Sequence, residues 1–307
     1  MGQSNAADFC LTSIFSPRTK ERATVYKRKE SKIVNIIKEM IGKISKRAPQ
    51  ECKTLGKTNN HAGKEKAGWI SPTYTNSRSV IIDPIIAEKN RCVAVFPNAP
   101  EMEAFRVLRR KILNLAESKG WNTFMVTSAL PGEGKTLTAI NLSLSFAREF
   151  AQTVLLVDCD LRNQSIHNTL GIKSDKGIID VLLNDTPITD VIIWPNIEKF
   201  TLISGGRTIQ DSAELLGSQK MRELFADMKT RYTDRFVFFD VPPLLSGADA
   251  LTFMSLVDAV LVVVQADKTS IDDVNRALEM IPNEKFLGLV VNRQKGRLKE
   301  YPYPGKP

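Results

Sequence analysis

Between about residue 100 and residue 295, the hydrophobic positions alternate between short continuous runs and segments of helical period. Short continuous apolar runs are typical of strands that are buried on both faces of a sheet. Segments with apolar residues every three or four positions are typical of helices that cover such a sheet. The alternation predicts an α/β fold with a doubly wound, mostly parallel sheet flanked by helices. The expected strands lie near 124–128, 154–157, 200–204, 236–240, 259–264 and 286–292, and the expected helices near 101–119, 137–147, 177–183, 211–231 and 270–281.

The N-terminal part has a different pattern. Residues 1–79 are mostly polar and basic, which predicts a basic, largely flexible arm. Within this arm, apolar residues at positions 33, 36, 37, 40, 41 and 44 predict an amphipathic helix near 33–47, with lysines on its other face. Such a helix suits an anionic membrane surface, a groove on a partner, or packing on its own domain, and the pattern leaves all three open. We expect one domain over 80–298 and a flexible tail with two tyrosines over 299–307.

The charge belongs to the arm. Residues 1–100 hold 18 Lys and Arg against 8 Asp and Glu, whereas the rest of the chain holds 25 against 26, within a net charge of +9. We therefore expect no nucleic-acid partner for the domain itself. The sequence shows neither a secretory signal nor a long apolar span, so we expect a cytoplasmic protein. Four scattered cysteines and two histidines do not have the spacing of a metal site.

A phosphate-binding loop is predicted where the first strand meets its helix. The stretch Ala129-Leu-Pro-Gly-Glu-Gly-Lys-Thr136 meets the pattern GxxxxGK[ST] except at its first position, where Ala129 replaces Gly. Backbone N–H groups would face the phosphates. Lys135 would reach the β- and γ-phosphates, and Thr136 would hold Mg²⁺. The alternative is a turn that only caps a helix. The residues expected at the nucleotide are Gly132, Glu133, Gly134, Lys135, Thr136 and Leu137.

Two further predicted strands end in carboxylates. The run 154–157 leads into Asp158-x-Asp160-x-Arg162, and the run 236–239 leads into Asp240. Ligands bind at the carboxyl ends of the strands in open α/β sheets. Asp158 and Asp160 could therefore hold Mg²⁺ or accept a hydroxyl proton, and Asp240 fits the Walker B position that orders the Mg²⁺ shell. The alternative is a set of ordinary turns, in which Asp is common.

The helix expected near 101–119 carries Glu103, Arg106 and Arg109 at three-residue intervals. These side chains could form local ion pairs or a charged face that meets another subunit. From spacing alone, a solvated face is the better interpretation.

Together these motifs resemble the bacterial tyrosine kinases of exopolysaccharide synthesis over about residues 100–295. The segments 128–136, 154–162 and 236–243 are similar to that family's Walker A, A′ and Walker B motifs, in the same order. Glu103-x-x-Arg106-x-x-Arg109 is similar to the family's oligomerisation motif. Ala213-Glu-Leu-Leu216 matches a further segment, although Gln210-Asp211-Ser212 departs from the Asn-Pro that usually precedes it. The region from Val80 also resembles the exosortase-associated subgroup.

The resemblance implies a P-loop NTPase-like fold, ATP and Mg²⁺ as cofactors, and tyrosine phosphorylation. It also implies a homo-oligomer and a membrane chain-length determinant or activator as a separate partner, which would place the chain at the inner membrane peripherally. Catalytic roles would fall to Lys135, Asp158, Asp160 and Arg162, the last either stabilising the transferring phosphate or pairing with Asp160. Thr136, Asp158 and Asp240 would hold the metal, and Asn292 would contact adenine.

The tail departs from the family. A dense tyrosine cluster usually serves as the autophosphorylation substrate, but only Tyr301 and Tyr303 stand here as expected phosphoacceptors, each before a proline. Two alternatives therefore stay open. One is a partitioning-type ATPase switch, although Leu130 stands where those ATPases usually carry a second lysine. The other is a weakly catalytic regulator of a polysaccharide chain-length protein.

Overall fold

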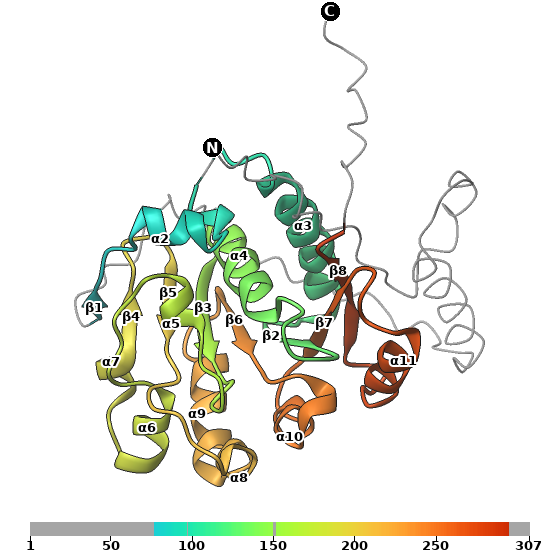
Figure 1. Ribbon diagram of the computed structural model, residues 1–307. Coiled ribbons are helices and arrows are strands. Elements are labelled where there is room, and N and C mark those ends of the chain that lie inside the picture. The colour runs from blue at the N-terminus through green and yellow to red at the C-terminus, as the bar shows by residue number, and fades with distance from the viewer. Residues whose placement is uncertain (1–76, 97, 150–151, 295–307) are drawn as a thin grey trace, which may run out of the picture.

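The computed structural model describes residues 77–96, 98–149 and 152–294, which form an eight-stranded sheet with helices on both faces (Figure 1). The strand order is β1-β4-β5-β3-β6-β2-β7-β8, and every neighbouring pair is parallel except β4 with β5. The strands are β1 (Arg78–Ser79), β2 (Thr123–Ser128), β3 (Thr153–Asp158), β4 (Ile192–Trp194), β5 (Phe200–Ile203), β6 (Arg235–Asp240), β7 (Ala259–Gln265) and β8 (Phe286–Asn292). The helices are α2 (Pro84–Lys89), η2 (Val93–Val95), α3 (Met102–Lys119), α4 (Lys135–Ala147), α5 (Ile166–Thr169), α6 (Ile178–Asn184), α7 (Ile188–Val191), α8 (Ser212–Leu216), α9 (Gln219–Thr230), η3 (Leu244–Ser246), α10 (Asp249–Met254) and α11 (Ile271–Glu279).

The sheet separates two hydrophobic cores. Successive residues of each strand point to opposite faces, so Phe124 and Val126 join one core while Met125 joins the other. The first core packs against α2, α3, α4 and α5, and the second packs against α6, α8, α9, α10 and α11. This double burial explains why the strands have continuous apolar runs rather than alternating ones.

The helix α4 lies deep in the first layer. Every residue from Thr138 to Ala147 is buried, because α4 lies between the sheet and α3. The hydroxyl of Ser143 is satisfied within the helix, because its Oγ donates to the carbonyl of Ile140 at 2.9 Å. A helix held this firmly gives the loop before it a fixed base.

The expected parallel α/β architecture is confirmed, with two corrections. The single helix expected over 211–231 is wrong, because the chain forms α8 and then α9. Gly217 ends α8, and Ser218 begins α9 by accepting a hydrogen bond from the N–H of Met221 at 3.1 Å. The two-residue strand β1, which lies inside the expected arm and pairs with β4, was not expected. The short strand β4 was not expected either. It pairs antiparallel with β5, with Ile192 opposite Ile203.

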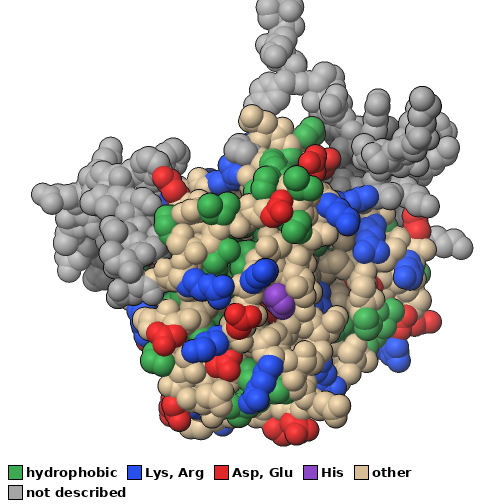
Figure 2. All heavy atoms as spheres, turned by 60° about the vertical axis from the view of Figure 1, so that its left-hand side comes forward, with side chains coloured by type: hydrophobic (Ala, Val, Ile, Leu, Met, Phe, Trp, Pro, Cys, Tyr) green, Lys and Arg blue, Asp and Glu red, His purple; other side chains and the backbone are tan. Residues whose placement is uncertain are grey.

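Several predictions lie outside the described residues. These are the helix near 33–47, the tail tyrosines Tyr301 and Tyr303, and the arm apart from residues 77–79. Within the part of the chain that the structure describes, no helix has the length and hydrophobicity needed to cross a membrane. On the face shown in Figure 2, acidic and basic side chains are intermingled, in keeping with the balanced charge after residue 100.

Candidate nucleotide-binding site

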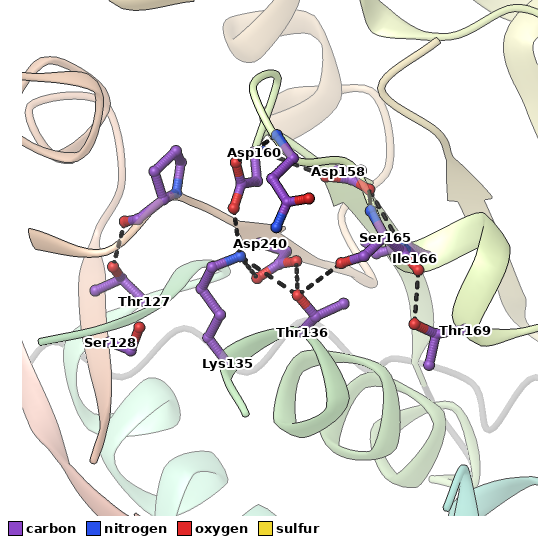
Figure 3. Close-up of polar contacts among 12 residues, drawn as sticks. Thr127, Ser128, Lys135, Thr136, Asp158, Asp160, Ser165, Ile166, Thr169 and Asp240 are labelled. Carbon is purple, nitrogen blue, oxygen red and sulfur yellow. Dashed lines mark hydrogen bonds and ion pairs between the residues drawn. The ribbon is translucent and has the colours of Figure 1, made fainter. Parts of the chain in front are cut away.

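The predicted site residues come together where β2, β3 and β6 end. These three strands are neighbours in the sheet, and Asp158 of β3 lies in register with Asp240 of β6. The loop after β2 runs directly into α4, so Lys135 and Thr136 begin the helix beside both acids (Figure 3). We name Lys135, Thr136, Asp158, Asp160 and Asp240 the phosphate corner.

The glycines of the loop have the conformation that a phosphate-binding loop needs. Gly132 and Gly134 adopt φ angles of 80° and 95°, a left-handed region in which a Cβ is strained. A Cβ built on Gly134 would lie 2.1 Å from Nδ2 of Asn292, whereas one on Gly132 would meet nothing within 4 Å. Ala129 is not among the residues of positive φ, so the first motif position does not require glycine here.

Lys135 lies between two carboxylates. Its Nζ is 2.7 Å from Oδ2 of Asp160 and 3.3 Å from Oδ1 of Asp240. Burial lowers the pKa of Lys135, but Asp240, Asp160 and Asp158 raise it, and the net direction is upward. The ammonium therefore stays charged, which a residue that stabilises phosphate charge needs.

The hydroxyl of Thr136 donates to Oδ2 of Asp240 at 2.6 Å and accepts from Oγ of Ser165 at 3.1 Å (Figure 3). Asp240 is fully buried, and burial raises its pKa while Lys135 opposes the rise. This pairing of a helix-start hydroxyl with a strand-end carboxylate is the arrangement by which P-loop proteins hold Mg²⁺.

Asp158 is held by backbone N–H groups. Its Oδ2 accepts from Ser165 N and Ile166 N, each at 3.1 Å, and its Oδ1 accepts from Asp160 N at 3.2 Å. Burial and the charge of Asp240 raise the pKa of Asp158 to about 7, although the bonds from Ile166 and Ser165 work in the opposite direction. A carboxylate with such a pKa suits proton transfer near neutral pH.

The donor set fits a magnesium nucleotide. The described residues contain no group of three or more His, Cys, Asp or Glu side chains arranged to hold a metal. Mg²⁺ is usually held by one or two carboxylates together with substrate phosphates and water. The hydroxyl of Thr136 and the carboxylates of Asp158 and Asp240 supply such oxygens, and Gly132 leaves space beside the loop.

A second polar network supports the loop from the other side. The carboxylate of Glu133 is buried; it accepts from Leu130 N at 2.7 Å and from the hydroxyl of Thr269. The amide of Asn292 donates to the carbonyl of Glu133 at 2.9 Å. We name Glu133, Gln265, Thr269 and Asn292 the bracing corner, since Gln265 N also donates to Thr269 Oγ1 at 3.0 Å.

The structure limits how Glu133 and Leu137, both expected at the nucleotide, could contact it. The side chain of Glu133 is engaged within the protein, so its backbone N–H is the group left to meet a nucleotide. The side chain of Leu137 packs against the first core, so its backbone N–H is likewise the group left to meet a nucleotide. The side-chain amide of Asn292 is already bound to the carbonyl of Glu133. Its contact with adenine stays a prediction.

Arg162 does not pair with Asp160. Its NH2 group lies 3.1 Å from Oδ2 of Asp249, and its Nε donates to Ser212 Oγ at 2.7 Å. The suggested ion pair with Asp160 is therefore wrong. Asp249 and Ser212 lie on α10 and α8, far along the chain, and Arg162 connects the A′ segment to these helices. Its role toward phosphate stays a prediction.

The three motif residues of α3, Glu103, Arg106 and Arg109, take part in two ion pairs, one within the helix and one with Glu149. Arg106 lies 3.1 Å from Glu103 on an exposed face, whereas Arg109 pairs with Glu149 at 2.9 Å. Arg109 is thus partly fixed at the end of α4. Oligomerisation through these residues stays a prediction.

Sequence reasoning did not find Ser165, the bracing role of the Glu133 side chain, or Asp249. Ser165 stands three positions after Arg162, and only its place before a helical turn could have marked it as a cap. Asp249 carries no motif, and its contact with Arg162 depends on the tertiary fold.

The chain matches known proteins over most of its described part. Residues 123–286 match a family model described as an AAA domain. The tyrosine-protein kinase YwqD of Bacillus subtilis is 31% identical over 221 residues, which cover 71% of this chain and 92% of that protein. The putative tyrosine-protein kinase CapB of Staphylococcus aureus is 25% identical over 231 residues, which cover 75% and 92%.

Two solved structures show the same fold. The chimerical protein CapA2B2 aligns with a TM-score of 0.63 and 28% identity, covering 74% of this chain and 96% of the other. The VpsO kinase domain aligns with a TM-score of 0.57 and 28% identity, covering 68% and 97%. The coverage of the relatives shows that the match extends over nearly the full length of each.

Proposed function

Since the chain belongs to the family of bacterial tyrosine-protein kinases, we propose that it is a Mg-ATP-dependent protein tyrosine kinase that phosphorylates tyrosines, its own included. The observation that carries this proposal is the phosphate corner. One ammonium, one hydroxyl and three carboxylates meet at the ends of three neighbouring strands, in front of a glycine loop. The further role, regulation of exopolysaccharide or capsule synthesis and export, rests on the family resemblance of the motifs.

Each residue of the corner has a defined task in this reaction. Phosphoryl transfer leaves the protein mainly positioning and charge stabilisation. Lys135 stabilises negative charge on the phosphates, and the loop N–H groups orient them. Thr136 and Asp240 would hold Mg²⁺, which would supply positive charge at the phosphates and leave Asp158 free of the metal. The acceptor oxygen forms its bond to the γ-phosphorus as the bond to the β-phosphate oxygen breaks and ADP leaves.

Asp158 is our choice for the proton acceptor. Its pKa of about 7 matches a base that takes the tyrosine proton near neutral pH. Asp160, in contrast, is paired with Lys135 at 2.7 Å, and its Oδ1 accepts from Asn163 N at 3.1 Å. We therefore assign Asp160 to holding Lys135.

The partners follow from the same proposal. A membrane chain-length determinant or activator would be the separate partner, and Glu103, Arg106 and Arg109 would lie at the contact between copies of the chain. The basic arm would add an attraction to an anionic membrane surface. These partners would bring the kinase to the inner membrane from the cytoplasmic side.

The decisive experiment is an incubation of the purified full-length protein with Mg-ATP, followed by phosphotyrosine mapping by mass spectrometry. We expect phosphate on Tyr301 or Tyr303. We expect the signal to be lost in Lys135→Met, because no other residue of the corner carries positive charge. The Tyr232→Phe variant serves as a matched control, since Tyr232 is half exposed on the domain and should not be required.

Two outcomes would contradict the proposal. One is ATP hydrolysis without phosphotyrosine on the protein or on a supplied membrane partner, which would favour a nucleotide-switch ATPase. The other is a full phosphotyrosine signal in Lys135→Met.

A further inference from the structure

A single helical turn connects the phosphate corner to the first described segment of the chain. This turn is α5, which begins directly after Ser165. The N–H groups of Ser165 and Ile166 donate to Oδ2 of Asp158, and the Ser165 hydroxyl donates to Thr136 (Figure 3). The start of α5 therefore touches both an acid of β3 and the hydroxyl that begins α4.

The other end of α5 is fixed as well. Thr169 donates back to the carbonyl of Ser165 through its N–H at 2.9 Å and through Oγ1 at 2.6 Å, so the turn is closed on itself. The carbonyl of Thr169 accepts from Nδ2 of Asn90 at 2.9 Å and from Sγ of Cys92 at 3.6 Å. Asn90 is thus connected to Ser165 by hydrogen bonds through the single turn of α5.

Asn90 and Cys92 belong to residues 83–96, which we name the strap. The strap contains α2 and η2. η2 packs on α4, and the side chains of Asn90 and Cys92 reach the end of α5. The fully buried Asn141 of α4 accepts from Ala94 N at 2.9 Å and donates to the carbonyl of Arg91 at 3.1 Å. The strap is therefore fixed to the same helix that carries Lys135 and Thr136.

Apolar contacts reinforce the link between the strap and α5. Ala87 and Cys92 of the strap share the first core with Ile166 and Leu170. Gly171, just after α5, packs closely on the strap, because a Cβ there would lie 3.0 Å from the Ile86 side chain, which would have to shift. The strap thus sets where α5 lies relative to α4.

We propose that Ser165 and Asn90 are positioning residues for the magnesium nucleotide. Ser165 orients the hydroxyl of Thr136, and Asn90 holds the turn that presents Ser165 and fixes Asp158. This proposal rests on the proposed function for the identity of the ligand, but not on tyrosine phosphorylation. It also gives the segment that follows the basic arm a direct mechanical connection to the site.

The test is equilibrium binding of a fluorescent ADP analogue to the full-length protein, titrated with Mg²⁺ and repeated without it. Residues that orient the groups around a metal typically change its affinity by about 10-fold or more when they are removed. We expect Ser165→Ala to raise the half-saturating Mg²⁺ concentration by about 10-fold. For the more distant Asn90→Ala we expect a smaller rise, on the order of threefold. Binding without Mg²⁺ should be unchanged in both variants.

Three variants serve as controls. Ser165→Thr keeps the hydroxyl and should restore the wild-type Mg²⁺ requirement. Ser174→Ala and Asn184→Ala remove side-chain hydrogen bonds of the same residue types on an exposed part of the surface, and should change nothing. A merely structural role would lower melting temperature and Mg²⁺-free binding together, without a selective change in the Mg²⁺ requirement.

The outcomes separate the two proposals. Equal Mg²⁺ requirements in Ser165→Ala, Ser165→Thr and wild type would overturn the positioning role alone. Mg²⁺-dependent binding by a wild-type protein that makes no phosphotyrosine would overturn the kinase alone. A wild-type protein that binds the nucleotide equally with and without Mg²⁺ would overturn both.

Discussion

The phosphate corner and the bracing corner lie on two sides of one loop and are built on opposite electrostatic principles. The phosphate corner brings three buried carboxylates to one ammonium, and burial raises the pKa of Asp158 and of Asp240. The bracing corner contains a single buried carboxylate, Glu133, and neutral N–H and hydroxyl groups meet its oxygens. One corner is thus crowded with like charge and the other is satisfied internally.

The difference between the two corners indicates which contacts make the loop rigid. A corner of unbalanced acids is poised to bind cationic partners, and its acids disfavour their own ionisation. A fully satisfied polar network rigidifies its surroundings instead. The loop is therefore fixed from the side that does no chemistry, so that the side facing the phosphates can remain electrostatically strained.

The substitution expected to disturb the bracing of the loop most is Gly134→Ala. The new Cβ would collide with the Asn292 amide and would also adopt a left-handed backbone, so the loop would separate from the bracing corner. We expect the free energy of unfolding to fall by about 3 kcal/mol or more, measured by urea denaturation without nucleotide. Gly132→Ala is the control. It has a similar φ but no clash, and we expect a loss of about 1 kcal/mol. Equal losses in the two variants would show that the contact with Asn292 does not matter.

A more selective change is Glu133→Ala. This variant leaves the partly buried N–H of Leu130 and the hydroxyl of buried Thr269 without their acceptor, and we expect a loss of about 2–3 kcal/mol in the free energy of unfolding. Glu133→Gln keeps one carbonyl oxygen and should lose about half of that. Denaturation without nucleotide measures both. Glu88→Ala on the exposed face of α2 is the control, and a Glu133→Ala protein as stable as that control would contradict the bracing role.

The smallest expected effect concerns the phosphate corner. The folded protein keeps the Asp158 proton up to about pH 7, whereas an unfolded chain releases it near pH 4, so ionisation costs stability as the pH rises between these values. Asp158→Asn cannot ionise. Relative to wild type, we expect this variant to gain about 2 kcal/mol between pH 5.5 and pH 8, whatever its fixed cost from altered hydrogen bonds. Denaturation curves at each pH provide the measurement. A difference between Asp158→Asn and wild type that stays constant with pH would contradict the raised pKa.

These predictions separate what the sequence could predict from what it could not. The parallel sheet and the meeting of Lys135, Thr136 and Asp240 followed from local patterns, because strands that alternate with helices bring their carboxyl ends to one edge. The break between α8 and α9 depended on Ser218 capping a helix inside an apolar repeat that would otherwise continue. Local period alone cannot show where such a repeat is interrupted.

Contacts between distant segments were out of reach for a different reason. Arg162 pairs with Asp249 rather than with Asp160, although Asp160 is two positions away, because the fold brings α10 beside the A′ segment. Likewise, the Glu133 side chain fits a loop pattern in sequence, but its partner Thr269 comes from the loop after β7. Side-chain partners of this kind follow from tertiary packing, which no spacing rule encodes.

The central place of β2 has a consequence for how the protein is made. Both strands that flank it come much later in the chain: β6 begins at Arg235 and β7 at Ala259, whereas β2 ends at Ser128. A ribosome delivers the chain from its N-terminus, so the strand that leads into the glycine loop must wait, unpaired, for more than a hundred residues to follow. The nucleotide site cannot close before Asp240 has emerged. During synthesis, the buried strand β2 is thus exposed to other nascent chains, and the first half of the domain depends on the second for its protection from aggregation.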